Sequence, residues 1–181
     1  MQTARALAMT GLALVAGCSA PSGSTAGTSS AQKEVSGSAM QAAAQPAGDR
    51  LGFTASTLDG KPFDGQSLRG KPAVMWFWAA WCSICAREAP TVAKVAAANP
   101  GVTFVGVSAL DGVPAMQKFV TDRGVGGFTH LADQDAAVWR RFGVTSQPAQ
   151  AFISADGTVS VVPGPMSEQD LASRVNALSQ P

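Results

Sequence analysis

The sequence is poor in the side chains that build most polar and metal sites. Its 181 residues include no tyrosine, one histidine and three cysteines, and 14% are charged, with a formal net charge of +1. A near-neutral chain without a basic run among aromatic residues lacks the electrostatic footprint of a nucleic-acid-binding protein. Zinc is held as a rule by four nitrogen or sulfur ligands. The three cysteines and the one histidine are the only such side chains of the sequence, and Cys18 has another predicted role, so too few ligands remain for zinc. We predict neither nucleic-acid binding nor a metal site, and we expect His130 to be a structural or surface residue with no part in catalysis.

The apolar segment from Ala6 to Ala16 is too short to cross a bilayer, which takes about 20 residues. Its length fits the hydrophobic part of an export signal. It ends in Leu14-Val15-Ala16-Gly17-Cys18, which resembles a bacterial lipobox, a motif whose cysteine is lipidated. We predict that residues 1–17 are a lipoprotein signal peptide and that lipidated Cys18 anchors the protein at the outer face of the cytoplasmic membrane. The alternative is an ordinary signal peptide and a secreted product.

Residues 18–50 are rich in alanine, glycine and serine and show no apolar periodicity. Such a composition cannot bury enough surface to offset the entropy lost on folding. We therefore predict a flexible tether, with an end-to-end distance of about 30 Å for a coil of this length. A single folded domain is predicted over residues 51–181.

Two cysteines lie where a predicted strand meets a predicted helix. The apolar run Ala73–Trp78 is typical of a buried strand, and a helical pattern covers residues 86–98, with Cys82 and Cys85 between them. The N–H groups and the dipole of a helix N-terminus favour a thiolate, so Cys82 is the predicted nucleophile. Cys85, about one turn further on, is within disulfide range and should be more buried. The alternative is a structural disulfide, but closing so short a loop stabilises little.

Elements on both sides of the cysteines alternate between strand and helix, which predicts an α/β fold with right-handed crossovers. Turn signals at Leu58-Asp59-Gly60 and at Asp156-Gly157 predict two β-hairpins. Asp133 is the predicted cap of the helix that follows it. The predicted strands span residues 51–57, 61–63, 73–78, 102–107, 128–132, 149–154 and 158–162, and the predicted helices span residues 86–98, 114–123, 135–142 and 168–178.

The segment Phe77-Trp78-Ala79-Ala80-Trp81-Cys82-Ser83-Ile84-Cys85, with Pro90 in the helix that follows, resembles the thioredoxin superfamily. Val144-Thr145-Ser146-Gln147-Pro148 agrees, because that family carries a cis-proline before an apolar strand, facing the cysteines. With its N-terminus, the chain resembles the extracytoplasmic Dsb thiol oxidoreductases of actinobacteria, in the DsbE/TlpA-like group. The resemblance implies a thioredoxin-like fold, with a central mixed β-sheet flanked by helices and an N-terminal β-hairpin. It also implies no cofactor beyond a redox-active disulfide.

The resemblance implies further site residues. Trp81 flanks the cysteine pair, and Pro148 should be cis and leave the backbone of Gln147 free to pair with an extended substrate. Glu88 stands where membrane-anchored relatives often carry a glutamate that helps proton transfer near the buried cysteine, but an exposed or capping carboxylate is an equal alternative. Thioredoxins proper have a buried aspartate six residues before the first cysteine. That position is Trp76 here, so we expect the buried proton acceptor to be missing.

The cysteine pair predicts a thiol–disulfide oxidoreductase. The resemblance and the missing aspartate imply an enzyme that forms disulfides in exported proteins, and the resemblance also implies recharging by a membrane partner of the vitamin K epoxide reductase type. A specific thiol reductase in cytochrome c maturation is the main alternative, because the resemblance extends to such proteins. A redox-inert or metal-handling binding module is a further alternative, for which one cysteine pair and one histidine supply few ligands. The fold also occurs in peroxidases, but Trp81-Cys82-Ser83-Ile84-Cys85 does not resemble their threonine-containing loop.

Overall fold

The structure, a computed structural model, describes residues 45–46 and 50–178. The predicted signal peptide, Cys18 and most of the predicted tether lie outside the described residues. Two residues of the predicted tether form the short strand β1 (Gln45–Pro46), which pairs with the edge of the sheet. None of the helices in the described part of the chain has both the length and the apolar character needed to cross a membrane.

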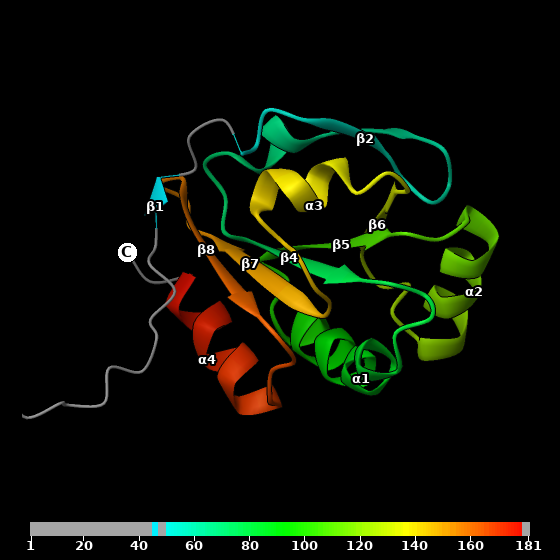
Figure 1. Cartoon of the computed structure of the whole chain (residues 1–181). Helices are drawn as coiled ribbons and strands as arrows, with labels where there is room; N and C mark the ends of the chain where they lie inside the picture. Colours follow the sequence, from blue (N-terminus) through cyan, green and yellow to red (C-terminus); the bar gives the residue numbers. More distant parts are fainter. Residues whose placement is uncertain (1–44, 47–49, 179–181) are drawn as a thin grey trace, which may run out of the picture. The chain divides into compact units, whose positions relative to one another are not determined.

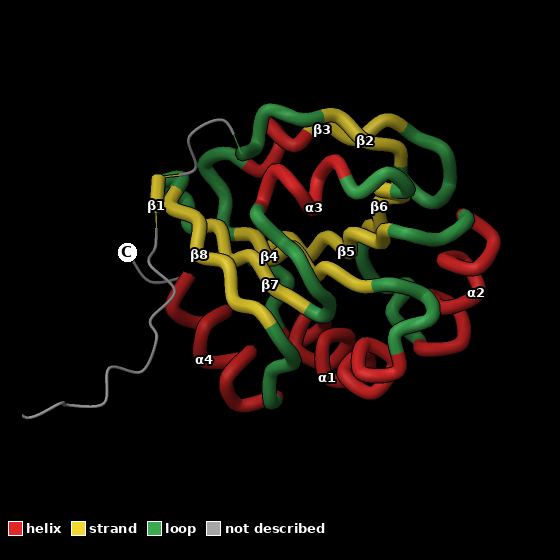
Figure 2. The backbone as a smooth tube through the Cα atoms, viewed as in Figure 1, coloured by secondary structure: helices red, strands yellow, loops and turns green. Residues whose placement is uncertain are grey.

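Six strands form the central sheet, in the order β1-β8-β7-β4-β5-β6 (Figures 1 and 2). Strands β4, β5 and β6 are parallel, whereas β7 is antiparallel to β4 and β8 is antiparallel to β7. A separate antiparallel hairpin of β2 and β3 precedes them, as predicted. This mixed sheet with an N-terminal hairpin confirms the thioredoxin-like fold. The further strands are β2 Thr54–Ser56, β3 Pro62–Asp64, β4 Ala73–Trp78, β5 Thr103–Ala109, β6 Thr129–Asp133, β7 Ala149–Ile153 and β8 Thr158–Pro163.

Helices cover both faces of this sheet. The α-helices are α1 Ser83–Ala98, α2 Val113–Arg123, α3 Ala137–Phe142 and α4 Glu168–Leu178, and a 3-10 helix spans Gly65–Leu68. Helices α1, α2 and α4 lie on one face, and α3 and the hairpin lie on the other (Figure 1). One cluster of buried hydrophobic residues packs beneath each of these two layers. Because β4 is central in the sheet and covered on both faces, all six of its residues are buried, as its continuous apolar run predicts.

Asp133 caps α3, as predicted. Its carboxylate accepts hydrogen bonds from the backbone N–H groups of Val138, at 3.0 Å, and Trp139, at 2.9 Å. The helix begins two residues later than predicted, because Ala136 has a left-handed backbone with φ of 57° and serves as its N-cap. The cap therefore acts across a turn that the sequence pattern does not reveal.

His130 is part of the core. Its side chain is buried, Nε2 lies 2.8 Å from the carbonyl oxygen of Val125, and its ring packs edge-on against Trp78 with 5.6 Å between centroids. Burial lowers the pKa of His130 to about 4, so the neutral imidazole is the core form at neutral pH. Gly106 lies opposite His130 on the neighbouring strand. Because glycine has no side chain, the rings of His130 and Trp78 fill the space beside it.

We expect Gly106→Ala to lower the free energy of unfolding by about 1–3 kcal/mol, the usual cost of overpacking a core. A Cβ atom at this position would overlap the His130 ring and lie 2.9 Å from Nε1 of Trp78. Guanidinium titration followed by circular dichroism measures the change. Gly101→Ala is the control, because its Cβ would meet no atom within 4 Å. Equal unfolding midpoints for the two variants would contradict this account of the packing.

Candidate active site

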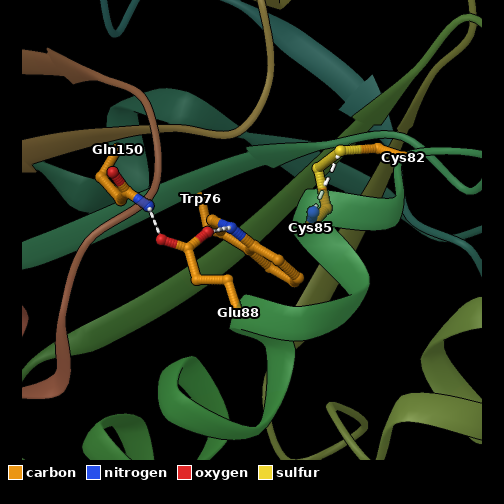
Figure 3. Close-up of a disulfide and its surroundings, with 5 residues drawn as sticks. All are labelled: Trp76, Cys82, Cys85, Glu88 and Gln150. Atoms are coloured by element: carbon orange, nitrogen blue, oxygen red, sulfur yellow. Dashed lines mark hydrogen bonds between the residues drawn. A yellow bond between two sulfur atoms is a disulfide. The ribbon is translucent and has the colours of Figure 1, made fainter. Parts of the chain in front are cut away.

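The two cysteines of the predicted pair form a disulfide where β4 passes into α1 (Figure 3). Cys82 is the N-cap residue of α1, with extended backbone angles, and the Cα atoms of Cys82 and Cys85 are 5.3 Å apart. The N–H of Cys82 donates to the carbonyl of Ala79, at 3.1 Å, and the carbonyl of Cys82 accepts from Ala86, at 3.0 Å. These bonds join the strand end to the first helical turn and hold Cys82 at the helix N-terminus.

The sulfur of Cys82 takes the place of a capping side-chain oxygen. Its Sγ accepts a hydrogen bond from the backbone N–H of Cys85, at 3.0 Å. That N–H is one of the donors that a helix leaves unpaired at its start. Cys85 is fully buried and Cys82 is 6% exposed, so the prediction that Cys85 is the more buried of the two is confirmed. Trp81, by contrast, is 60% exposed beside them.

The Gln147–Pro148 peptide bond is cis, as predicted. Strand β7 runs antiparallel to β4 with Ala149 opposite Phe77, so Pro148 lies at the sheet edge where β4 ends and the cysteines begin. Pro148 is buried and Gln147 is half-buried. The carbonyl of Pro148 accepts a hydrogen bond from Gly164, at 2.9 Å, which ties this turn to the end of β8.

Glu88 carries a buried carboxylate, and its side chain is 5% exposed. Oε2 accepts from the indole N–H of Trp76, at 2.9 Å, and Oε1 accepts from Nε2 of Gln150 and from the backbone N–H of Met166, each at 2.7 Å. In Figure 3 the carboxylate points toward Trp76 and Gln150 and away from the disulfide. Burial raises the pKa of Glu88, and the three N–H donors oppose that rise. The alternative of an exposed or capping carboxylate was wrong.

A buried carboxylate is therefore present although Trp76 replaces the aspartate of thioredoxins proper. That aspartate is absent at position 76, and the buried carboxylate comes instead from Glu88 on α1, where the indole of Trp76 binds it. Sequence reasoning missed Gln150 and the backbone of Met166. Gln150 could have been found from the sequence, because it is the single polar residue in the strand Ala149–Ile153. Met166 could not, because it contacts Glu88 through its backbone N–H and lies 78 residues away in the sequence.

Comparisons with known proteins agree with this geometry. Residues 45–162 match the AhpC/TSA family. The solved structure of MTB dsbF is 59% identical and covers 74% of this chain and 98% of its own, with a TM-score of 0.71. A secreted Mycobacterium tuberculosis disulfide oxidoreductase homologous to E. coli DsbE is 52% identical and covers 71% of this chain and 98% of its own, with a TM-score of 0.68. The thiol:disulfide interchange protein DsbE of Pseudomonas fluorescens biotype C is 30% identical over 132 residues, which are 70% of this chain and 73% of that protein.

No group of three or more His, Cys, Asp or Glu residues among those that the structure describes could hold a metal ion.

We expect Glu88 to make the fold more stable as the pH falls from neutral. Because burial raises its pKa above the ordinary 4.5, the folded protein takes up this proton at a higher pH than the unfolded chain does. The gain should begin at the raised folded pKa and be complete below about 4.5, where the unfolded chain is protonated as well.

Urea unfolding of the wild type and of Glu88→Gln between pH 7 and pH 4.5 measures this effect. The wild type should gain stability relative to the variant as the pH falls. His130 is present in both proteins, so its opposite contribution cancels in the difference. A stability difference that does not change with pH would show that Glu88 titrates alike in both states.

Proposed function

The chain belongs to the AhpC/TSA family within the thioredoxin superfamily and is a protein thiol–disulfide oxidoreductase, and we propose that it forms disulfides in exported proteins through Cys82 and Cys85. The observation that carries this proposal is the position of the Cys82 sulfur at the N-cap of α1, where it accepts the N–H of Cys85. The export of the relative described as secreted supports the same compartment for this chain.

This position favours the oxidising direction. When the disulfide is reduced, a Cys82 thiolate keeps the N–H donor of Cys85 and lies at the positive end of the helix dipole. Both interactions lower the free energy of the thiolate, and so of the reduced enzyme. A dithiol whose reduced form is stabilised has a disulfide that is a stronger oxidant.

In the proposed reaction a client thiolate attacks Sγ of Cys82. The Cys82–Cys85 bond breaks, the sulfur of Cys85 leaves with the electron pair, and a mixed disulfide joins the client to Cys82. A second client thiolate then attacks the client sulfur of that bond, and Cys82 leaves as the thiolate. Two electrons pass from the client to the enzyme, which ends as the dithiol. A membrane partner of the vitamin K epoxide reductase type is the proposed acceptor of those electrons.

The leaving sulfur of Cys85 needs a proton, because it is fully buried and burial disfavours a thiolate. Glu88, one helical turn further along α1, is the proposed proton donor, since burial raises its pKa. Its carboxylate is bonded to Trp76 and Gln150, so the proton passes through a water molecule or after rotation of the side chain.

The proposed client-binding elements flank the disulfide. The backbone of Gln147, before the cis-Pro148, is proposed to pair with an extended client segment, and the exposed ring of Trp81 to pack against it. Residues 1–17 are proposed to direct export, and a lipid on Cys18 with a tether of residues 18–50 is proposed to hold the domain at the membrane.

A specific reductase in cytochrome c maturation is the second candidate. The buried Glu88 favours it, because a carboxylate near the buried thiol can accept the Cys85 proton when the reaction runs from the dithiol. In that direction the Cys82 thiolate attacks a client disulfide and Cys85 resolves the mixed disulfide.

The reduction potential of the Cys82–Cys85 couple separates the two candidates. We expect roughly −120 to −180 mV for an enzyme that forms disulfides, whereas roughly −270 mV indicates a reductase. The full chain with Cys18→Ser, which leaves one reactive pair, is equilibrated with glutathione buffers, and the oxidised fraction is measured by mass spectrometry after alkylation. A potential in the lower range would reject the oxidant and retain the reductase.

The order of attack is tested by trapping. We expect Cys85→Ser to accumulate a mixed disulfide between Cys82 and a client in its disulfide form, because no resolving thiol remains. Cys82→Ser is the matched control and should trap far less, since its remaining thiol is fully buried. Gel electrophoresis without reductant measures both adducts, and equal trapping by the two variants would reject Cys82 as the attacking residue.

A further inference from the structure

Leu110 combines two features that oppose folding. Its backbone is left-handed, with φ of 62°, a conformation in which a side chain with a Cβ atom crowds the following carbonyl. Its side chain is also 55% exposed. Ala136 is the other non-glycine residue with positive φ in the described part of the chain, and it has only a methyl group. A strained backbone that presents a large apolar side chain to solvent points to a function.

The turn itself does not require a leucine. After Leu110 the chain enters α2, and the side chain of Asp111 accepts the N–H of Gly112, at 2.8 Å. The carbonyl of Gly112 then accepts the N–H of Ala115, at 3.0 Å, which starts the helix. Glycine or asparagine at position 110 would adopt the same backbone at lower cost. The leucine side chain therefore serves something other than this turn.

Strand register places Leu110 at the same end of the sheet as the disulfide. Strands β4 and β5 are parallel with Trp78 opposite Ser108, so Leu110 leaves β5 at the same sheet edge where Cys82 follows β4. Strand β7 lies on the other side of β4 and brings Pro148 to this edge. The strand end that leads to the disulfide thus lies between the strand β7 that follows Pro148 and the strand end that leads to Leu110.

Exposed apolar side chains gather at this edge. Three large hydrophobic residues are exposed in the described part of the chain. Trp81, which precedes Cys82, is 60% exposed, and Ile84, which lies between the two cysteines, is 40% exposed. The third is Leu110, which is 55% exposed. A client segment whose sulfur reacts with Cys82 approaches the end of the sheet that carries these three side chains. The surface that meets the client is therefore apolar where the reaction takes place.

We propose that Leu110 is a specificity-determining residue that binds an aliphatic or aromatic side chain next to the reactive cysteine of an extended client segment. The inference rests on the proposed function of Cys82. Cysteines and their apolar neighbours become buried when a protein folds. An apolar contact beside the reactive cysteine therefore selects clients that have not yet folded, for which a disulfide remains to be made.

Two synthetic peptides and one small dithiol test this inference. The peptides each contain two cysteines and differ only in a leucine or a serine next to the first cysteine, and dithiothreitol lacks any side chain. The protein is the full chain with Cys18→Ser. Stopped-flow fluorescence measures the rate constant with which each peptide, and dithiothreitol, reduces the Cys82–Cys85 disulfide. We expect the wild type to react roughly three to ten times faster with the leucine peptide, as partial burial of two leucine side chains implies.

Substitutions at position 110 then assign the preference. Leu110→Gly and Leu110→Ala should lose most of the peptide preference, and Leu110→Met should keep it. Of the first two variants, Leu110→Gly should melt a few degrees higher, roughly 2–5 °C, because glycine relieves the left-handed strain that alanine keeps. Ala136→Gly is the matched control, since it relieves the other positive φ of a non-glycine residue in the described part of the chain. Ala136 lies at α3, on the face of the sheet opposite to that of the cysteines, so this variant should keep the peptide preference.

Each outcome has one meaning. A preference that survives in Leu110→Gly and Leu110→Ala overturns the inference. A wild type that dithiothreitol reduces but that does not distinguish the two peptides also overturns it and leaves the proposed function standing. A disulfide that neither the peptides nor dithiothreitol reduce removes the proposed function itself.

Discussion

The carboxylate of Glu88 joins four parts of the structure at one buried point. Removing a charge from water costs several kcal/mol, so a buried carboxylate is retained only where donors surround it. Those donors come from β4, through Trp76, from β7, through Gln150, and from the segment before α4, through the backbone of Met166. Helix α1 can bring Glu88 to all three donors only in one orientation about its own axis. Since Cys85 lies one turn earlier on the same helix, that orientation also sets where the second sulfur is buried.

The same helix gives the two sulfurs opposite environments. Cys82 lies at the helix N-terminus and accepts an N–H, which stabilises its thiolate, whereas Cys85 is fully buried among apolar side chains, which disfavours a thiolate. We therefore expect two chemically identical thiols to differ in acidity because of their places on one turn of helix. In the proposed reaction that difference decides which sulfur is attacked and which one needs a proton, and a carboxylate whose pKa burial raises lies one turn away.

The sequence predicts the features that short-range rules govern. The central strand has the bounds of the apolar run from Ala73 to Trp78, helix α4 has the predicted bounds, and Asp133 caps α3. The surroundings of Glu88 could not be predicted in this way, because its partner Gln150 lies 62 residues away in the sequence and only the folded sheet brings the two together. An amphipathic helix pattern leaves a glutamate at that position open to either reading, and the choice depends on the donors opposite it. The late start of α3 likewise follows from the backbone of Ala136, which no propensity rule favours for alanine.

Around the disulfide the usual distribution of side chains is inverted. A charged residue, Glu88, is buried, while Trp81, Ile84 and Leu110 are exposed. Each inversion fits one part of the proposed reaction: the buried carboxylate lies one helical turn from Cys85, the sulfur that is proposed to exchange a proton, and the apolar side chains lie at the surface that is proposed to meet the client. A sequence optimised for stability alone would place glycine at position 110. At position 88 an apolar residue alone would leave the N–H donors of Trp76, Gln150 and Met166 unpaired, so a stabilising replacement would have to change Trp76 and Gln150 as well. The strained leucine and the buried carboxylate thus have different costs, and the proposed disulfide chemistry accounts for both.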